Sequence, residues 1–172
     1  MVTAGFGQRL IESVATKRSH VVVGFDPDYE LLPAAVVADH PRKDYRSDEE
    51  MITACYRDFL TELLSSVAEQ AVAVKLQVAC FETLGPMGWE LYEELVRVGQ
   101  QRGLLVITDA KRGDIGKTAE AYAAAHLDRA GADAMTVNPY LGSDSLEPFL
   151  RRVREQAKGI FVLVKTSNPS SV

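Results

Sequence analysis

Three cations and two carboxylates are crowded into one short segment, TDAKRGDIGKT, which runs from Thr108 to Thr118 directly after the apolar stretch 104–107. Residues two apart on a strand share a face, so we expect Asp109 and Lys111 to point the same way and Asp114 to lie in the following turn. Charges beside a buried strand are costly unless they are paired. Oppositely charged side chains that pair at the end of a buried strand are typical of a catalytic site, where the pKa values of the catalytic groups are shifted.

The end of the same segment invites comparison with a nucleotide-binding loop. Gly116, Lys117 and Thr118 follow a strand pattern and open a helical one. The phosphate-loop motif requires a further glycine five positions before Gly116, and that position holds Lys111. The sequence therefore argues against a kinase or ATPase, and Gly113 and Gly116 are expected to form a tight turn that aims Asp114.

The elements that must position these groups alternate along the chain. Short apolar runs predict five buried parallel strands, at 21–25, 72–76, 104–108, 134–138 and 160–165. Helical spacing is seen at 6–14, from a capping box at Ser47 to residue 64, from Pro86 to a stop at Gly103, at 119–130 before Gly131, and at 144–157, closing near Gly159. The segment 27–46 is irregular, and we expect a long loop or partial helix at the rim.

Alternating strands and helices without the glycine fingerprint of a dinucleotide fold favour a (β/α)8 TIM barrel, an α/β fold. The barrel would gather the residues at the carboxyl ends of the strands at one mouth, namely Asp26, Lys75, Asp109, Lys111, Asn138 and Thr166. A complete barrel has eight strands and about 250 residues. We therefore expect residues 1–172 to form a single partial barrel domain with about five of the eight βα units.

Composition excludes several classes of protein. A net charge of −5, from 19 basic and 24 acidic residues, argues against binding to a nucleic acid polymer. No apolar run approaches the roughly 20 residues of a membrane span. Cys55 and Cys80 lack metal-site spacing and are expected to be buried thiols in a reducing, cytoplasmic compartment. The three histidines are scattered, so no metal site is predicted.

Five segments carry a family resemblance. The run from Asp109 to Thr118 resembles the D-x-K-x-x-D-I-x-x-T signature of the orotidine 5′-phosphate decarboxylase family, and looks most like the bacterial subfamily with the form DAKRGDIG. Four further segments look like strand ends of the same family and follow in its order: GFDP at 24–27, VKLQ at 74–77, NPYLG at 138–142 and TSNP at 166–169.

The resemblance implies cofactor-free conversion of orotidine monophosphate to uridine monophosphate and CO2, in de novo pyrimidine biosynthesis, by a homodimer with shared active sites. It makes Lys111 the proton donor to C6 of the pyrimidine and places Asp109 beside the substrate carboxylate. The remaining roles that it implies are a charged network completed by Lys75 and by Asp114 of the neighbouring subunit, ribose binding by Asp26 and Lys75, pyrimidine binding by Ser167, and contacts to the partner's site from Ile115 and Thr118.

Simpler interpretations of the same residues remain open. Asp109 and Lys111 could form a structural ion pair, Lys75 could be a snorkelling lysine, Asp114 a helix cap and Asp26 a turn residue. Lys165 departs from the small residue expected on the family's fifth strand. The family binds phosphate with its last two strands, so we expect this chain to be truncated and to have little activity. Two other functions remain open for this chain: a related barrel lyase acting on a sugar-phosphate acid, and a non-catalytic half-barrel that serves as an assembly or binding module.

Overall fold

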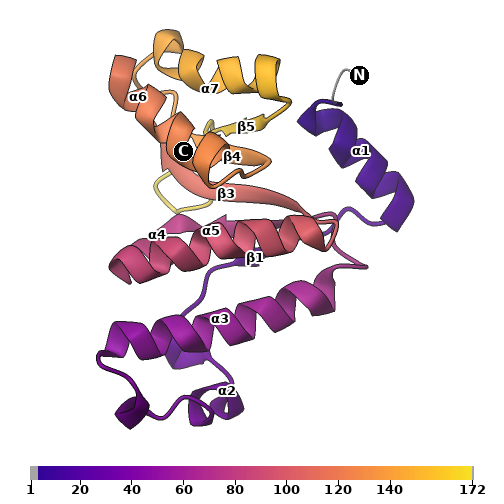
Figure 1. Ribbon diagram of the computed structural model, residues 1–172. Helices are drawn as coiled ribbons and strands as arrows, with labels where there is room; N and C mark the ends of the chain where they lie inside the picture. Colours follow the sequence, from indigo (N-terminus) through magenta and orange to yellow (C-terminus); the bar gives the residue numbers. More distant parts are fainter. Residues whose placement is uncertain (1–3, 172) are drawn as a thin grey trace.

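The computed structural model describes residues 4–171, which form one parallel five-stranded sheet (Figure 1). Its strands lie side by side in chain order: β1 (Val22–Phe25), β2 (Ala73–Gln77), β3 (Leu105–Arg112), β4 (Ala134–Val137) and β5 (Gly159–Val162). All five predicted strands are confirmed, and their sequential parallel order is that of consecutive βα units of a (β/α)8 barrel. The predicted fifth strand was too long: β5 ends at Val162, and Lys165 lies beyond it in an exposed segment.

Helices connect and cover the strands. The longer ones are α1 (Phe6–Lys17), α3 (Asp48–Val67), α5 (Gly85–Gln101), α6 (Gly116–Ala123) and α7 (Ser143–Gln156), and the short ones are α2 (Ala34–Ala38) and α4 (Val78–Glu82). The π-helix η3 (Ala124–Arg129) continues α6, and two 3₁₀ turns, η1 (Tyr29–Leu31) and η2 (Arg42–Asp44), flank α2. Segment 27–46 is therefore the partial helix that the sequence predicts. No helix in residues 4–171 combines the length and apolarity that crossing a bilayer requires.

The sheet separates two apolar layers because side chains alternate between its faces. On the outer face, Val74, Leu76 and Val106 pack in a core with leucines of α3 and α5, which lie side by side in Figure 1. On the inner face, α1 packs Phe6 and residues of its next two turns against Ala73, Leu105, Ile107 and Ala134. This second layer covers the amino-terminal half of the inner face.

Helix ends agree with the sequence in part. Ser47 accepts a hydrogen bond from the backbone N–H of Glu50, as a capping box requires, but the Glu50 carboxylate accepts from the N–H of Arg46 instead of that of Ser47. Gly103 has a φ of 73°, as expected of a left-handed stop after α5. The helix predicted at 144–157 is confirmed within one residue, since α7 ends at Gln156, but the left-handed residue that follows it is Ala157, with a φ of 57°, and not Gly159.

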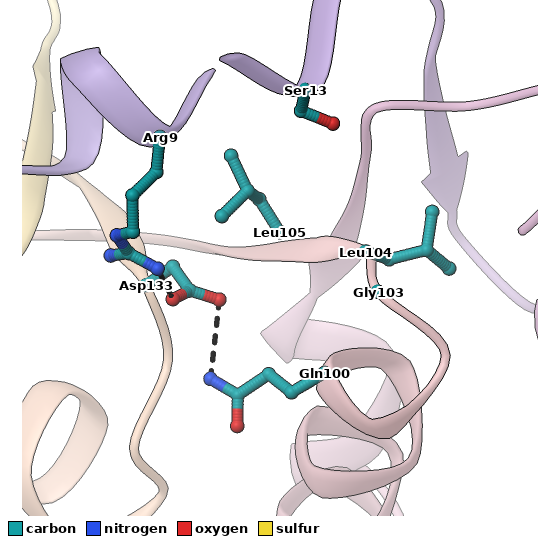
Figure 2. Close-up of a pocket in the computed structure, with 7 residues that line it drawn as sticks. All are labelled: Arg9, Ser13, Gln100, Gly103, Leu104, Leu105 and Asp133. Atoms are coloured by element: carbon teal, nitrogen blue, oxygen red, sulfur yellow. Dashed lines mark hydrogen bonds and ion pairs between the residues drawn. The ribbon is translucent and has the colours of Figure 1, made fainter. Parts of the chain in front are cut away.

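Asp133 ties the amino-terminal end of the sheet together (Figure 2). One carboxylate oxygen accepts hydrogen bonds from the backbone N–H of Val106 at 2.9 Å and from the Gln100 amide at 3.1 Å, and the other pairs with Arg9 of α1 at 2.5 Å. Arg9, Gln100 and Asp133 border a cavity of about 400 Å³ between α1, the end of α5 and the start of β3. This end of the sheet lies opposite the carboxyl ends of the strands, so the role of Asp133 is to stabilise the fold.

A buried polar network stands behind β3. The Tyr92 hydroxyl lies 2.6 Å from the Thr108 hydroxyl and 3.2 Å from Nδ1 of His126, and all three residues are buried. Burial, with a smaller contribution from the positive charge of Arg112, lowers the pKa of His126 from 6.5 to about 4. The imidazole is therefore neutral in the folded protein at pH 7.

This network predicts a loss of stability in mild acid. An unfolded chain protonates His126 near pH 6.5 and the folded chain only near pH 4, so protons favour the unfolded state as the pH falls through that window. The loss from this group is expected to total about 3 kcal/mol. Denaturant titrations of the full-length protein at pH 7 and 4.5, with a His126→Gln variant as control, check it. Equal losses in the two proteins would contradict this assignment.

The cysteine prediction holds for one residue of two. Cys55 is buried in α3, whereas Cys80, on the exposed side of α4, is only partly buried, and both are free thiols. Cys80 differs because α4 is a single short helix at the carboxyl end of β2, with Val78 and Phe81 as its buried residues.

Candidate active site

Two lysines clamp one carboxylate at the carboxyl end of the inner face. Nζ of Lys75, from β2, lies 2.6 Å from one oxygen of Asp109, and Nζ of Lys111 lies 2.6 Å from the other. The pairing of β2 with β3 sets Gln77 opposite Asp109, so Lys75 stands one step back on the same face. The predicted convergence of these three side chains is confirmed.

The carboxylate is the buried member of this cluster. The side chain of Asp109 is 8% exposed, compared with 32% for Lys75 and 44% for Lys111. Burial alone would raise the pKa of Asp109, but hydrogen bonds from the two lysines and Thr136 lower it below its ordinary value. Asp109 is thus an anion near neutral pH, and the more exposed ammonium groups can face a ligand.

A β-bulge shapes the strand that carries Asp109 and Lys111. Thr108 pairs with Met135 and Arg112 with Val137, so three residues of β3, at 109–111, stand opposite the single residue Thr136 of β4. Lys111 has a φ of 51°, a left-handed conformation that is rare outside glycine. Asp109 and Lys111 do meet, as predicted, but they do so through a bulge and not through the regular alternation of a strand.

Two further polar residues contact the carboxylate. The Thr136 hydroxyl donates to Asp109 at 2.9 Å and accepts from the backbone N–H of Lys111, also at 2.9 Å. The Gln77 amide lies 3.5 Å from carboxylate oxygens of both Asp109 and Asp26. The sequence reasoning missed both residues, although each is a polar residue in an apolar strand and shares the inner face with a charged candidate.

Below the charged cluster, the inner face is apolar. A cavity of about 290 Å³ is bordered by Lys75 and Thr136, and by the apolar side chains of Leu10, Val22, Ile107 and Phe161. The charged groups therefore sit at the boundary between an apolar interior and the open mouth of the strands. Electrostatic interactions are stronger at such a boundary than in bulk water.

The loop after β3 depends on glycine. A Cβ atom on Gly113 would stand 2.5 Å from the backbone oxygen of Asn138, and Gly116 has a φ of 52°. The predicted tight turn is not formed: residues 113–115 link β3 to α6 as an irregular three-residue connection, which places Asp114 just before α6. Its carboxylate accepts from the backbone N–H of Ile115 at 2.8 Å, and Ile115 is itself the N-cap residue, so Asp114 is not the helix cap.

The close approach of Gly113 to Asn138 predicts that a side chain at position 113 destabilises the fold. Alanine at this position must push the 112–115 loop away from the end of β4, because the obstructing atom is a backbone oxygen that cannot rotate aside. We expect Gly113→Ala to destabilise the full-length protein by about 1–3 kcal/mol, as overpacking does. Urea denaturation checks this, with Gly7→Ala as a control, since nothing lies within 4 Å of a Cβ atom there. Equal stabilities of the two variants would contradict the close approach.

The remaining predicted residues lie around the cluster or away from it. Asp26 follows β1 directly and reaches the cluster through Gln77. Ile115 and Thr118 are exposed at the start of α6, and Ser167 lies in the exposed segment after β5. Within residues 4–171, no hydrogen bond joins Asp114, Thr118 or Ser167 to the cluster. In the same range, no group of three or more His, Cys, Asp or Glu side chains is arranged to hold a metal ion.

Known proteins are similar to this chain in both amino-acid sequence and three-dimensional structure. A protein from Rhodopirellula baltica named orotidine 5′-phosphate decarboxylase is 44% identical over 95% of this chain and 55% of its own length. A protein of the same name from Roseiflexus is 40% identical, over 96% of this chain and 54% of its own. The chain thus spans about half the length of these curated relatives.

Solved structures of proteins with related names have a similar fold. A crystal structure described as an orotidine 5′-phosphate decarboxylase from Streptomyces avermitilis superposes with a TM-score of 0.81 at 36% identity, covering 99% of this chain and 56% of the other. The OMP decarboxylase of Leishmania donovani gives a TM-score of 0.75 at 35% identity, covering 97% and 56%. The sequence model of the orotidine 5′-phosphate decarboxylase / HUMPS family matches residues 19–172. The chain therefore belongs to the orotidine 5′-phosphate decarboxylase / HUMPS family.

Proposed function

We propose that the protein containing this chain decarboxylates orotidine 5′-phosphate to uridine 5′-phosphate. The observation that carries the proposal is the row of Lys75, Asp109 and Lys111, with both ammonium groups 2.6 Å from one buried carboxylate. The family match and the names of the relatives support it. A structural ion pair would need one lysine, whereas here a second cation stands on the other side of the same anion.

The chemistry follows from where charge must develop. The bond between C6 of the pyrimidine and its carboxylate breaks, CO2 leaves, and the electron pair stays on C6. The Lys111 ammonium, on a side chain that is 44% exposed, is the proposed donor of the proton that C6 takes up. Ammonium groups held in place before the reaction stabilise a carbanion at no cost in reorganisation. Asp109 is proposed to lie beside the substrate carboxylate and to disfavour the bound ground state.

The other binding roles are proposals of the same kind. Asp26 and Lys75 are proposed to bind the ribose, and Ser167 the pyrimidine. Asp114, Ile115 and Thr118 are proposed to act in the site of the second subunit of a homodimer, because all three lie on or next to the start of α6 and outside the cluster of their own chain. We further propose that the enzyme is cytoplasmic and needs no cofactor.

An assay of the full-length protein tests this function. The loss of orotidine 5′-phosphate absorbance is followed with and without EDTA, alongside intact-mass measurement to establish the length of the natural chain. Turnover that survives EDTA is the expected result. Activity only on a sugar-phosphate acid, and only with Mg²⁺, would favour the related barrel lyase. A natural chain of 18.9 kDa that is folded, monomeric and inactive would favour the non-catalytic half-barrel.

A further inference from the structure

Thr136 occupies the one place where β3 and β4 leave their regular register. It stands alone opposite residues 109–111, is only 9% exposed, and contacts both ends of the bulge through one hydroxyl group. That hydroxyl lies 2.9 Å from Asp109 Oδ1 and 2.9 Å from the backbone nitrogen of Lys111. A single side chain therefore links the anion and the proposed proton donor.

The direction of both hydrogen bonds is fixed by chemistry. The backbone N–H of Lys111 can only donate, so the Thr136 oxygen must accept from it. The ionised Asp109 carboxylate can only accept, so the single hydroxyl proton must point at that carboxylate. Because a bulge interrupts the ladder, the hydroxyl supplies the Lys111 N–H with an acceptor at the point of interruption.

The orientation of both catalytic candidates depends on this arrangement. Asp109 Oδ1 receives hydrogen bonds from Thr136 and from the Lys111 ammonium, while Oδ2 receives one from Lys75. Without the hydroxyl, one restraint on carboxylate rotation is lost. The part-buried Lys111 N–H loses its acceptor, which favours a change in the unusual backbone conformation of this residue.

We propose that Thr136 is a positioning residue, which holds the bulge of β3 so that the Lys111 ammonium is aimed beside the Asp109 carboxylate without itself touching the substrate. The proposal rests on the decarboxylase function proposed above. Ile107 is apolar and cannot replace these two hydrogen bonds, and the Gln77 amide lies 3.5 Å from Asp109 Oδ2, on the other side of the carboxylate from Thr136. The role is one of geometry, so it predicts an effect on turnover and not on substrate affinity.

The test compares three substitutions in the full-length protein. Thr136→Val keeps the shape of the side chain and removes the hydroxyl, whereas Thr136→Ser and Thr136→Ala differ from one another by the hydroxyl alone. We expect valine and alanine to lower kcat about 100-fold, with KM changed less than about threefold, and serine to stay within about threefold of the original protein. Thr53→Val is the matched control, since it removes another buried hydroxyl, which donates to the backbone carbonyl of Glu49 in α3.

A second measurement keeps this role separate from the function itself. Hydrogen exchange at the Lys111 amide is expected to be at least about tenfold faster in Thr136→Ala than in Thr136→Ser, since only serine retains the acceptor. An active original protein whose valine and alanine variants keep full kcat would overturn the positioning role and leave the function standing. If the original protein has no decarboxylase activity, the proposed function fails, and equal exchange in the serine and alanine variants would overturn the hydroxyl contact as well.

Discussion

Replacing Lys111 with alanine is expected to lower the turnover of orotidine 5′-phosphate by the full-length protein at least about 10⁴-fold, the upper range for a lost general acid combined with lost charge stabilisation. The substitution removes the proposed proton donor to C6 and one of the two ammonium groups on Asp109. The fold should persist, because the Lys111 side chain is 44% exposed and its loss opens no cavity. Steady-state kinetics and thermal melting of the purified variant check both expectations.

The matched control is Lys43→Ala, which removes an exposed lysine of η2 far along the chain from the cluster. It should leave turnover unchanged. A Lys111→Ala enzyme that keeps more than a tenth of the original turnover would eliminate the proton-donor role. A variant that is inactive because it has unfolded would be recognised by its melting curve, and Lys111→Met, which keeps most of the side chain and removes the ammonium group, would then decide the question.

Two inactive variants are expected to restore activity when they share one dimer. If Asp114 completes the neighbour's site, a heterodimer of Lys111→Ala and Asp114→Ala subunits contains one site with both defects and one site with neither. Purified heterodimer should then show about half the turnover of the original dimer, as two-fold symmetry requires. Co-expression with two different affinity tags isolates this species, and each homodimer measured alone gives the background.

A second pairing serves as the control for shared sites. Lys111→Ala combined with Asp109→Asn should give no rescue, because both residues belong to the same chain's cluster and every site in the heterodimer keeps one defect. Rescue in neither pairing would mean that Asp114 does not act across an interface. Rescue in both would mean that Asp109 and Lys111 of one chain do not act in the same site, which contradicts the cluster as described.

The sequence predicts those parts of the fold that depend on local pattern. Apolar runs identified all five strands, and Gly103 marked the end of α5 because a left-handed residue is needed there. The left-handed residue after α7 is not a glycine, because alanine tolerates that conformation at a cost of about 1–2 kcal/mol, so Ala157 ends the helix before Gly159 is reached. Residue preferences alone cannot predict which of two nearby residues takes the left-handed conformation when the difference in free energy is this small.

The sequence predicted the charged residues of the cluster but missed two neutral residues that contact it, Gln77 and Thr136. Lys75, Asp109 and Lys111 drew attention because charge in an apolar strand is unusual, and the structure joins them. The bulge could not be foreseen, since it arises from how β3 pairs with β4 and not from either strand alone. Thr136 and Gln77 carry the same kind of signal in weaker form, because a hydroxyl or an amide in a strand often faces solvent.

The left-handed backbone at Lys111 implies a conflict between foldability and chemistry at this position. Glycine adopts this conformation freely, so a side chain here makes the native state less favourable than it could be, by about 1 kcal/mol. A chain selected for robustness alone would carry no amine at this point. Natural proteins tolerate such losses where activity requires them, and the proton-donor role proposed for Lys111 would account for a lysine at this left-handed position.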